Sequence, residues 1–193
     1  MASWPMVEPP KAGPRPTPAR LHEAALAHLA RYATTRQGLV RVLDRRVDRW
    51  LRRAGETDAL AKVELRRWVR EVAGRLVASG VIDDAAFAEA RARTLTRAGR
   101  SRRAVAAHLG ARGVDQGIVA EATQDDPETE LAACLALTRR RRIGPFRRPE
   151  AEPDLAREMA MIARAGFSHE TARRAMAMEA EEALALVIAL KQI

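Results

Sequence analysis

Arginine is the residue type in this chain best suited to bind a partner chemically, through its charge and its hydrogen-bond donors. All but three of its 34 Lys and Arg residues are arginines, and the 193-residue chain has a formal net charge of +9. The guanidinium group presents a planar fork of donors that fits phosphates and carboxylates. This balance favours an anionic partner such as nucleic acid or an acidic protein groove. A GC-rich genome also exchanges Lys for Arg, but such codon bias does not explain the net charge.

The arginines gather in three stretches of the sequence. In the first, arginines form a stripe along a predicted helix, namely Arg41, Arg45, Arg49 and Arg52. At a rotation of 100° per residue this stripe lies opposite the apolar positions Leu39, Leu43, Val47 and Trp50. Seven arginines and no acid lie between 91 and 112, and six arginines and no acid lie between 139 and 148. A charged stripe is usually a solvated face, but dense like charges destabilise helices unless a partner relieves them. We therefore expect the following residues to bind a partner or DNA: Arg41, Arg45, Arg49, Arg52, Arg91, Arg93, Arg97, Arg100, Arg102, Arg103, Arg112, Arg139, Arg140, Arg141, Arg142, Arg147 and Arg148.

The sequence predicts no catalytic residues, no cofactor and no metal site. No nucleophile, base and orienting group can be assembled without arbitrary choices, and the segment 99–101 lacks the pattern of a nucleotide-binding loop. The four histidines lack the paired spacing of a metal site. Cys134 is the only cysteine, so it cannot form an internal disulfide and we expect it to be a small buried residue.

The first 20 residues contain six prolines and no apolar stretch. This composition predicts a disordered tail and no signal peptide. The longest apolar stretch, 183–190, is far shorter than the roughly 20 residues of a membrane span. We expect a cytoplasmic monomer without membrane contact.

The elements that must position the arginines are predicted to be helices with a repeated punctuation. Leu109, Gly113, Val114 and Asp115 correspond to Ile162, Gly166, Phe167 and Ser168, which lie 53 residues further on. The glycine reaches the left-handed conformation that ends a helix, the next residue can pack back on that helix, and Asp or Ser caps the following one. Such units bury too little alone and must stack.

The predicted organisation is a tail (1–20) followed by three helical units (21–82, 83–126 and 127–193). Within the first unit, helices are expected at about 21–32, from Thr35, and at 58–78, with Trp50 and Trp68 in the core. Gly99 should end the first helix of the second unit, and Ser101 should cap the next. In the third unit a helix over 128–138 is followed by a loop at 143–149 and by further helices from Asp154.

Three pieces of the chain carry a resemblance to a known family. They are the segment 35–39 with Leu43, the connector 76–88, and the segment 101–105 leading to 109–114. On these pieces the chain resembles, over about 24–175, the RecX family of bacterial regulators of the RecA recombinase.

The resemblance implies an all-α fold in which three tandem three-helix units stack into an elongated, curved body. It also implies a regulator without enzymatic activity that binds in the groove of the RecA filament on DNA. There it would inhibit ATP hydrolysis and strand exchange and so modulate DNA repair, recombination and the SOS response. The implied partners are the RecA filament and single- or double-stranded DNA, the latter bound weakly by the protein alone.

The alternative is a DNA-binding protein of the helix-turn-helix kind that acts on bare DNA. In that case 101–122 would form two helices, and Arg102, Arg103 and Arg112 would contact phosphates. The second of these helices is expected to expose no Asn, Gln or Arg that could read bases, which weakens this interpretation.

Overall fold

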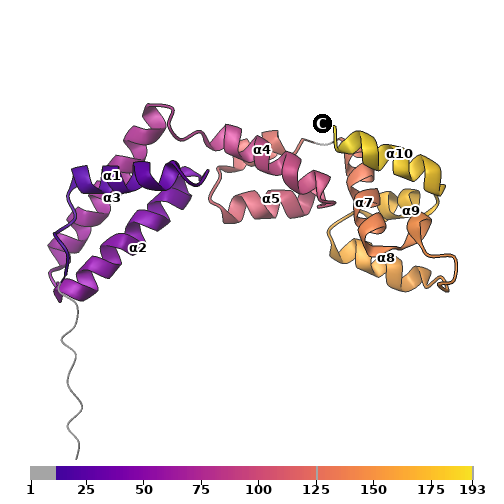
Figure 1. The fold of residues 1–193 in the computed structure, drawn as a ribbon, viewed down its shortest axis with the longest axis horizontal. Helices are drawn as coiled ribbons and strands as arrows, with labels where there is room; N and C mark the ends of the chain where they lie inside the picture. Colours follow the sequence, from indigo (N-terminus) through magenta and orange to yellow (C-terminus); the bar gives the residue numbers. More distant parts are fainter. Residues whose placement is uncertain (1–11, 125, 193) are drawn as a thin grey trace, which may run out of the picture. The chain divides into compact units, whose positions relative to one another are not determined.

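The structure, a computed structural model, describes residues 12–124 and 126–192. Within these residues it contains ten α-helices, one 3₁₀ helix and no strand (Figure 1). The predicted all-α class is therefore confirmed. The chain divides into two compact units, the first ending at Asp84 and the second beginning at Ala85.

The first unit is built from α1 (Pro18–Leu29), α2 (Arg36–Ala54) and α3 (Ala59–Ala78). Both α1 and α2 pack against α3 (Figure 1). The Thr35 side chain accepts a hydrogen bond from the Gly38 amide at 2.9 Å, and Asp58 caps α3. These two predicted helix starts are correct, because each side chain satisfies amides that the first turn leaves without partners.

The predicted place of the two tryptophans was wrong. The apolar face of α2 is completed by buried Leu51, whereas Trp50 and Trp68 are only partly buried at the edge of the core. The Trp50 indole Nε1 instead donates to the Gly13 carbonyl oxygen at 2.8 Å. An indole with a polar N–H is well placed where one edge can reach a partner.

The predicted disordered tail is corrected for the described residues 12–20. Pro16 is buried, and Thr17 caps α1, which begins at Pro18. Arg15 forms an ion pair with Glu64 at 2.8 Å. These contacts hold residues 12–20 against the rest of the first unit. Their proline content alone predicts a disordered segment. Residues 1–11 of the predicted tail lie outside the described residues.

The second unit begins with α4 (Asp84–Arg97), α5 (Arg102–Ala111) and α6 (Gln116–Ala122). These helices share a small cluster of buried residues, namely Ala88, Ala92, Val105, Leu109 and Val114. Gly99 follows α4 with a φ of +75°, and the Ser101 side chain caps α5, as predicted.

The rest of the second unit comprises α7 (Pro127–Arg141), η1 (Gly144–Phe146), α8 (Leu155–Arg164), α9 (His169–Met176) and α10 (Ala180–Leu190). Helix α7 is buried along most of its length and contacts α8, α9 and α10. Its Cys134 is fully buried as predicted, and burial raises the pKa of that thiol to about 12.

Two boundaries in this part differ from the sequence prediction. Helix α7 continues to Arg141, because cations in a last turn stabilise the negative end of a helix. The stretch 143–149, predicted as a loop, contains the 3₁₀ turn η1. Arg142 ends α7 in the left-handed conformation, with a φ of 56°, whereas the residue that ends α2 in this conformation is Gly55.

The repeated punctuation between helices is confirmed. Leu109 and Ile162 are fully buried, and Val114 and Phe167 are 6% and 5% exposed. Gly113 and Gly166 have φ values of +80° and +96°. Asp115 caps α6 and Ser168 caps α9. The two connections therefore have the same local construction, as their spacing in the sequence indicates.

Direct hydrogen bonds join α4–α6 to the helices that follow. The Ser101 hydroxyl donates to the Ala165 carbonyl oxygen at 2.8 Å, and the Arg102 amide donates to Glu130 Oε2 at 2.9 Å. The described residues contain three hydrophobic clusters, one in each predicted unit. The last two clusters nevertheless belong to one compact unit. Among the described residues, no helix has the length and apolar character needed to cross a bilayer.

Candidate partner-binding surface

Helix α2 exposes the four arginines that the sequence singled out, Arg41, Arg45, Arg49 and Arg52. The two acids of this helix are engaged elsewhere, because Arg66 of α3 binds Asp44 at 2.8 Å and also binds Asp48. This pairing neutralises the acids on the side of α2 that faces α3. The outer side of α2 is therefore strongly basic.

Sequence reasoning missed two further arginines of α2. Arg46 and Arg53 are exposed and, together with Arg49, line a small cavity of the first unit. Their separation of seven residues is close to two helical turns, so it places them on one face. That spacing is a signal which the sequence contained.

In the second unit, α4 and α5 expose nearly all of the predicted arginines of 91–112. Arg91 is half-buried, and the exposed ones are Arg93, Arg97, Arg100, Arg102, Arg103 and Arg112. Acids from outside this stretch, on the same helix or brought by the fold, lie near some of them. Arg93 lies 3.6 Å from Glu89, and a cavity of about 370 Å³ is lined by Arg93, Arg97 and Arg102 together with Glu89, Glu121, Asp126 and Glu130. This part of the surface therefore carries both signs.

Arg100 and Arg103 differ from the arginines that lie near these acids. Both are exposed, and within the described part of the chain no carboxylate forms an ion pair with either. Their charges are available for an external anion.

His108 lies among these arginines on α5. The Nε atom of Arg91 donates to His108 Nε2 at 3.2 Å, so Nε2 acts as the acceptor of a neutral imidazole. Burial lowers the pKa of His108 below its ordinary value of 6.5, and the charges of Arg91, Arg112 and Arg100 lower it further. The imidazole is thus kept neutral first by its burial and then by the positive charges around it.

This environment predicts a stability that falls in acid. The unfolded chain takes up the His108 proton near pH 6.5, whereas the folded chain resists it until the pH falls through the lowered pKa. We expect the free energy of unfolding to be larger above pH 6.5 and to decline toward pH 5 through this group. In urea titrations at pH 7.5 and pH 5.5, His108→Gln should show a smaller decline than the wild type. Equal declines in the two proteins would contradict this assignment.

The arginines at the end of α7 are exposed, namely Arg139, Arg140, Arg141 and Arg142. Arg140 also has a structural contact, because its guanidinium donates to the Ala98 carbonyl oxygen at the end of α4. The remaining three extend the basic surface of the second unit.

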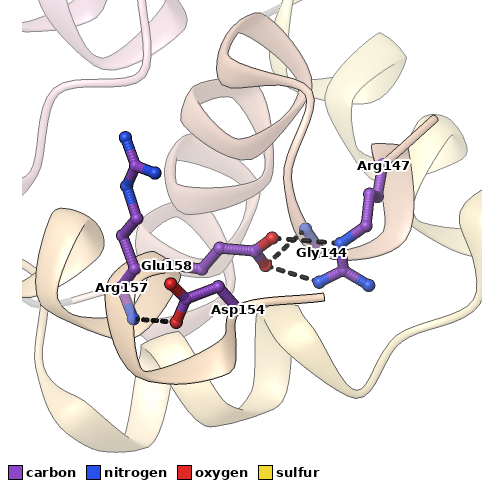
Figure 2. A network of polar contacts seen from close by, with 5 residues as sticks. All are labelled: Gly144, Arg147, Asp154, Arg157 and Glu158. Carbon is purple, nitrogen blue, oxygen red and sulfur yellow. Dashed lines mark hydrogen bonds and ion pairs between the residues drawn. The ribbon is translucent and has the colours of Figure 1, made fainter. Parts of the chain in front are cut away.

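Arg147 is placed in an internal ion pair, which the sequence did not indicate. Its Nε and Nη2 atoms donate to the two carboxylate oxygens of Glu158 at 3.0 and 2.6 Å (Figure 2). Glu158 is 7% exposed and also accepts the Gly144 amide at 3.1 Å. The hydrogen bond to Glu158 raises the pKa of Arg147. This arginine therefore holds the η1 turn on α8, while neighbouring Arg148 is exposed.

Removing Arg147 should destabilise the second unit. In Arg147→Ala the nearly buried Glu158 carboxylate would keep only the amide of Gly144, and a buried charge without its counter-ion is unfavourable. We expect the thermal midpoint, measured by circular dichroism, to fall by several degrees. Arg148→Ala removes an adjacent exposed arginine and should leave the midpoint unchanged. Equal midpoints for the two variants would show that the ion pair contributes nothing to stability.

Comparisons with known proteins give a consistent result. A family model described as the second three-helix domain of RecX matches residues 83–122. The chain is 39% identical over 173 residues to "Regulatory protein RecX" of Myxococcus xanthus (strain DK1622), which is 86% of this chain and 88% of that protein. It is 41% identical over 133 residues to "Regulatory protein RecX" of Thermobifida fusca (strain YX), covering 67% and 71% of the two chains.

A solved structure titled "Crystal structure of regulatory protein RecX" resembles this fold with a TM-score of 0.61. The match covers 82% of this chain and 70% of that chain, at 21% sequence identity. At this identity the likeness concerns the fold alone.

Proposed function

The chain belongs to the RecX family of regulatory proteins, and from this premise we propose that it regulates the RecA recombinase by binding the RecA–DNA filament. The proposed effect is inhibition of ATP hydrolysis and strand exchange, exerted in the cytoplasm without enzymatic chemistry of its own. The contacts are proposed to lie in the groove of the filament, which offers carboxylates on protein and phosphates on DNA.

The observation that carries this proposal is the set of exposed arginines without internal ion pairs. Arg100 and Arg103 of the second unit and Arg45, Arg49 and Arg52 of the first are of this kind among the described residues. Guanidinium groups form strong, charge-assisted hydrogen bonds with both carboxylates and phosphates. A surface of this kind fits a partner that presents both.

The helix-turn-helix alternative has less support. Its recognition helix would be α6, which has only seven residues and contains no arginine. The expectation that this helix exposes no base-reading side chain needs one correction, because Gln116 at its start is exposed. A single glutamine on two helical turns offers little sequence readout in a major groove.

Binding of the labelled protein to preassembled filaments separates the two functions. Fluorescence anisotropy would compare RecA filaments on single-stranded DNA with the same DNA alone and with duplex, at moderate salt. Tighter binding to the filament is the expected result. Equal or tighter binding to bare duplex, with steep salt dependence, would favour the alternative.

A further inference from the structure

The N-terminal segment and α2 enclose a basic cavity of about 220 Å³ in the first unit. Four arginines line it, Arg20 from α1 and Arg46, Arg49 and Arg53 from α2, and its lining includes no carboxylate. Trp50 forms part of its wall. Only Arg49 among these residues belongs to the surface predicted from the sequence.

The wall made by the N-terminal segment is held in place by several contacts. Trp50 Nε1 binds the Gly13 carbonyl oxygen at 2.8 Å, and Pro16 is buried. Arg15 lies across α3, paired with Glu64 at 2.8 Å and 5.8 Å from the centre of the Trp68 ring. Residues 13–16 therefore complete a formed cavity together with residues of α1 and α2.

The charges in the cavity are not balanced from within the unit. The nearest acids along α2, Asp44 and Asp48, are bound by Arg66 of α3. Among the described residues no carboxylate pairs with Arg20, Arg46, Arg49 or Arg53. Four like charges around one small volume repel one another, and an anion bound among them relieves that repulsion.

The size and surroundings of the cavity indicate the kind of anion. Its volume lies below the roughly 300 Å³ at which pockets for drug-sized ligands begin, so it suits one phosphate group and not a whole nucleotide. The arginines continue beyond it along α2 with exposed Arg45 and Arg52. A basic track beside an aromatic side chain is the combination that proteins use to bind single strands without sequence preference.

We propose that this cavity binds a backbone phosphate of single-stranded nucleic acid, and that the segment 13–16 together with Arg20, Arg46, Arg49 and Arg53 forms the site. The strand continues along the exposed arginines of α2. This site does not depend on the proposed function, because it requires no recombinase.

The test is binding of a labelled oligothymidine to the full chain alone, followed by anisotropy over a range of salt. The test variant is Arg46→Gln with Arg53→Gln, and the control is Arg70→Gln with Arg75→Gln on α3, where both arginines are exposed. Losing the one phosphate contact of the cavity should lower the slope of log affinity against log salt by about 0.7, the value per neutralised phosphate for single strands. Affinity should fall about tenfold or more in the test variant, since each charged hydrogen bond contributes about 1.5 kcal/mol or more. The control should keep both its affinity and its slope.

Trp50→Phe probes the contribution of the N-terminal segment. It removes the hydrogen bond to Gly13 but keeps an aromatic ring, so binding should weaken without a change in salt slope. Competition then identifies the ligand. Displacement of the oligonucleotide by a phosphodiester strand, but not by inorganic phosphate or polyglutamate at equal charge and ionic strength, supports the site.

Equal displacement by inorganic phosphate or by polyglutamate would overturn the assignment to nucleic acid. Unchanged affinity and slope in the double glutamine variant would overturn the site itself. Neither result bears on inhibition of the recombinase, which is measured separately with RecA present.

Discussion

Reversing the charge of Arg100 and Arg103 is expected to abolish inhibition of the RecA ATPase at protein ratios where the wild type inhibits strongly. Both side chains are exposed, and no ion pair within the described residues occupies either of them. Two charge-assisted contacts at about 1.5 kcal/mol each correspond to about 3 kcal/mol, or a loss of affinity of about 100-fold. Repulsion by the new carboxylates adds to this loss. Arg102 is left unchanged because its backbone amide donates to Glu130, and a glutamate at position 102 itself would disturb that contact.

The matched control is Arg70→Glu with Arg75→Glu, which makes the same change in net charge at exposed positions of α3. We expect this control to inhibit like the wild type. Helicity by circular dichroism should be equal in both variants and the wild type, because all four positions are exposed. Wild-type inhibition by the Arg100→Glu, Arg103→Glu protein would exclude this part of the surface from the filament contact.

Gly99→Ala should strongly destabilise the second unit. Gly99 is buried, its φ is +75°, and a Cβ atom placed there would lie 2.7 Å from the backbone nitrogen of Leu137 and 3.1 Å from the Ala136 carbonyl carbon. The left-handed conformation costs an alanine about 1–2 kcal/mol. A clash with the backbone of α7 adds about 1–3 kcal/mol, since no flexible side chain can move aside. We expect a loss of about 3 kcal/mol in urea unfolding.

Gly80→Ala separates these two causes. Gly80 has a similar φ of +71°, but a Cβ atom there meets nothing within 4 Å. This variant should therefore lose only the conformational part, about 1–2 kcal/mol. If both variants lose the same free energy, the close approach of Gly99 to α7 has no energetic effect.

The sequence predicted the features that depend on neighbouring residues. Glycines with capping residues beside them define helix ends through contacts within one or two turns, so Ser101, Asp115 and Ser168 were identified as caps. The buried positions Leu39, Leu43 and Val47 follow from helical periodicity for the same reason. Where adjacent large residues compete for one face, as Trp50 and Leu51 do, periodicity alone is too coarse to choose between them.

The features that the sequence did not predict depend on residues far apart in the chain. Glu130 lies 28 positions from Arg102, and only the fold brings this acid to the basic stretch. The sequence places Arg147 on the binding surface, but Glu158, 11 positions away, takes its guanidinium into an internal ion pair. The ordered segment 12–17 depends on Trp50, Glu64 and Trp68, whose positions become known only once α2 and α3 have packed.

The most direct test of the proposed function is the rate of ATP hydrolysis by the host's RecA on single-stranded DNA, titrated with this protein in moderate salt. The account predicts strong inhibition at ratios of protein to RecA that are too low to coat the DNA. An unchanged rate up to stoichiometric ratios, in a sample where the protein binds bare DNA with steep salt dependence, would contradict a filament regulator and favour a protein that acts on DNA itself.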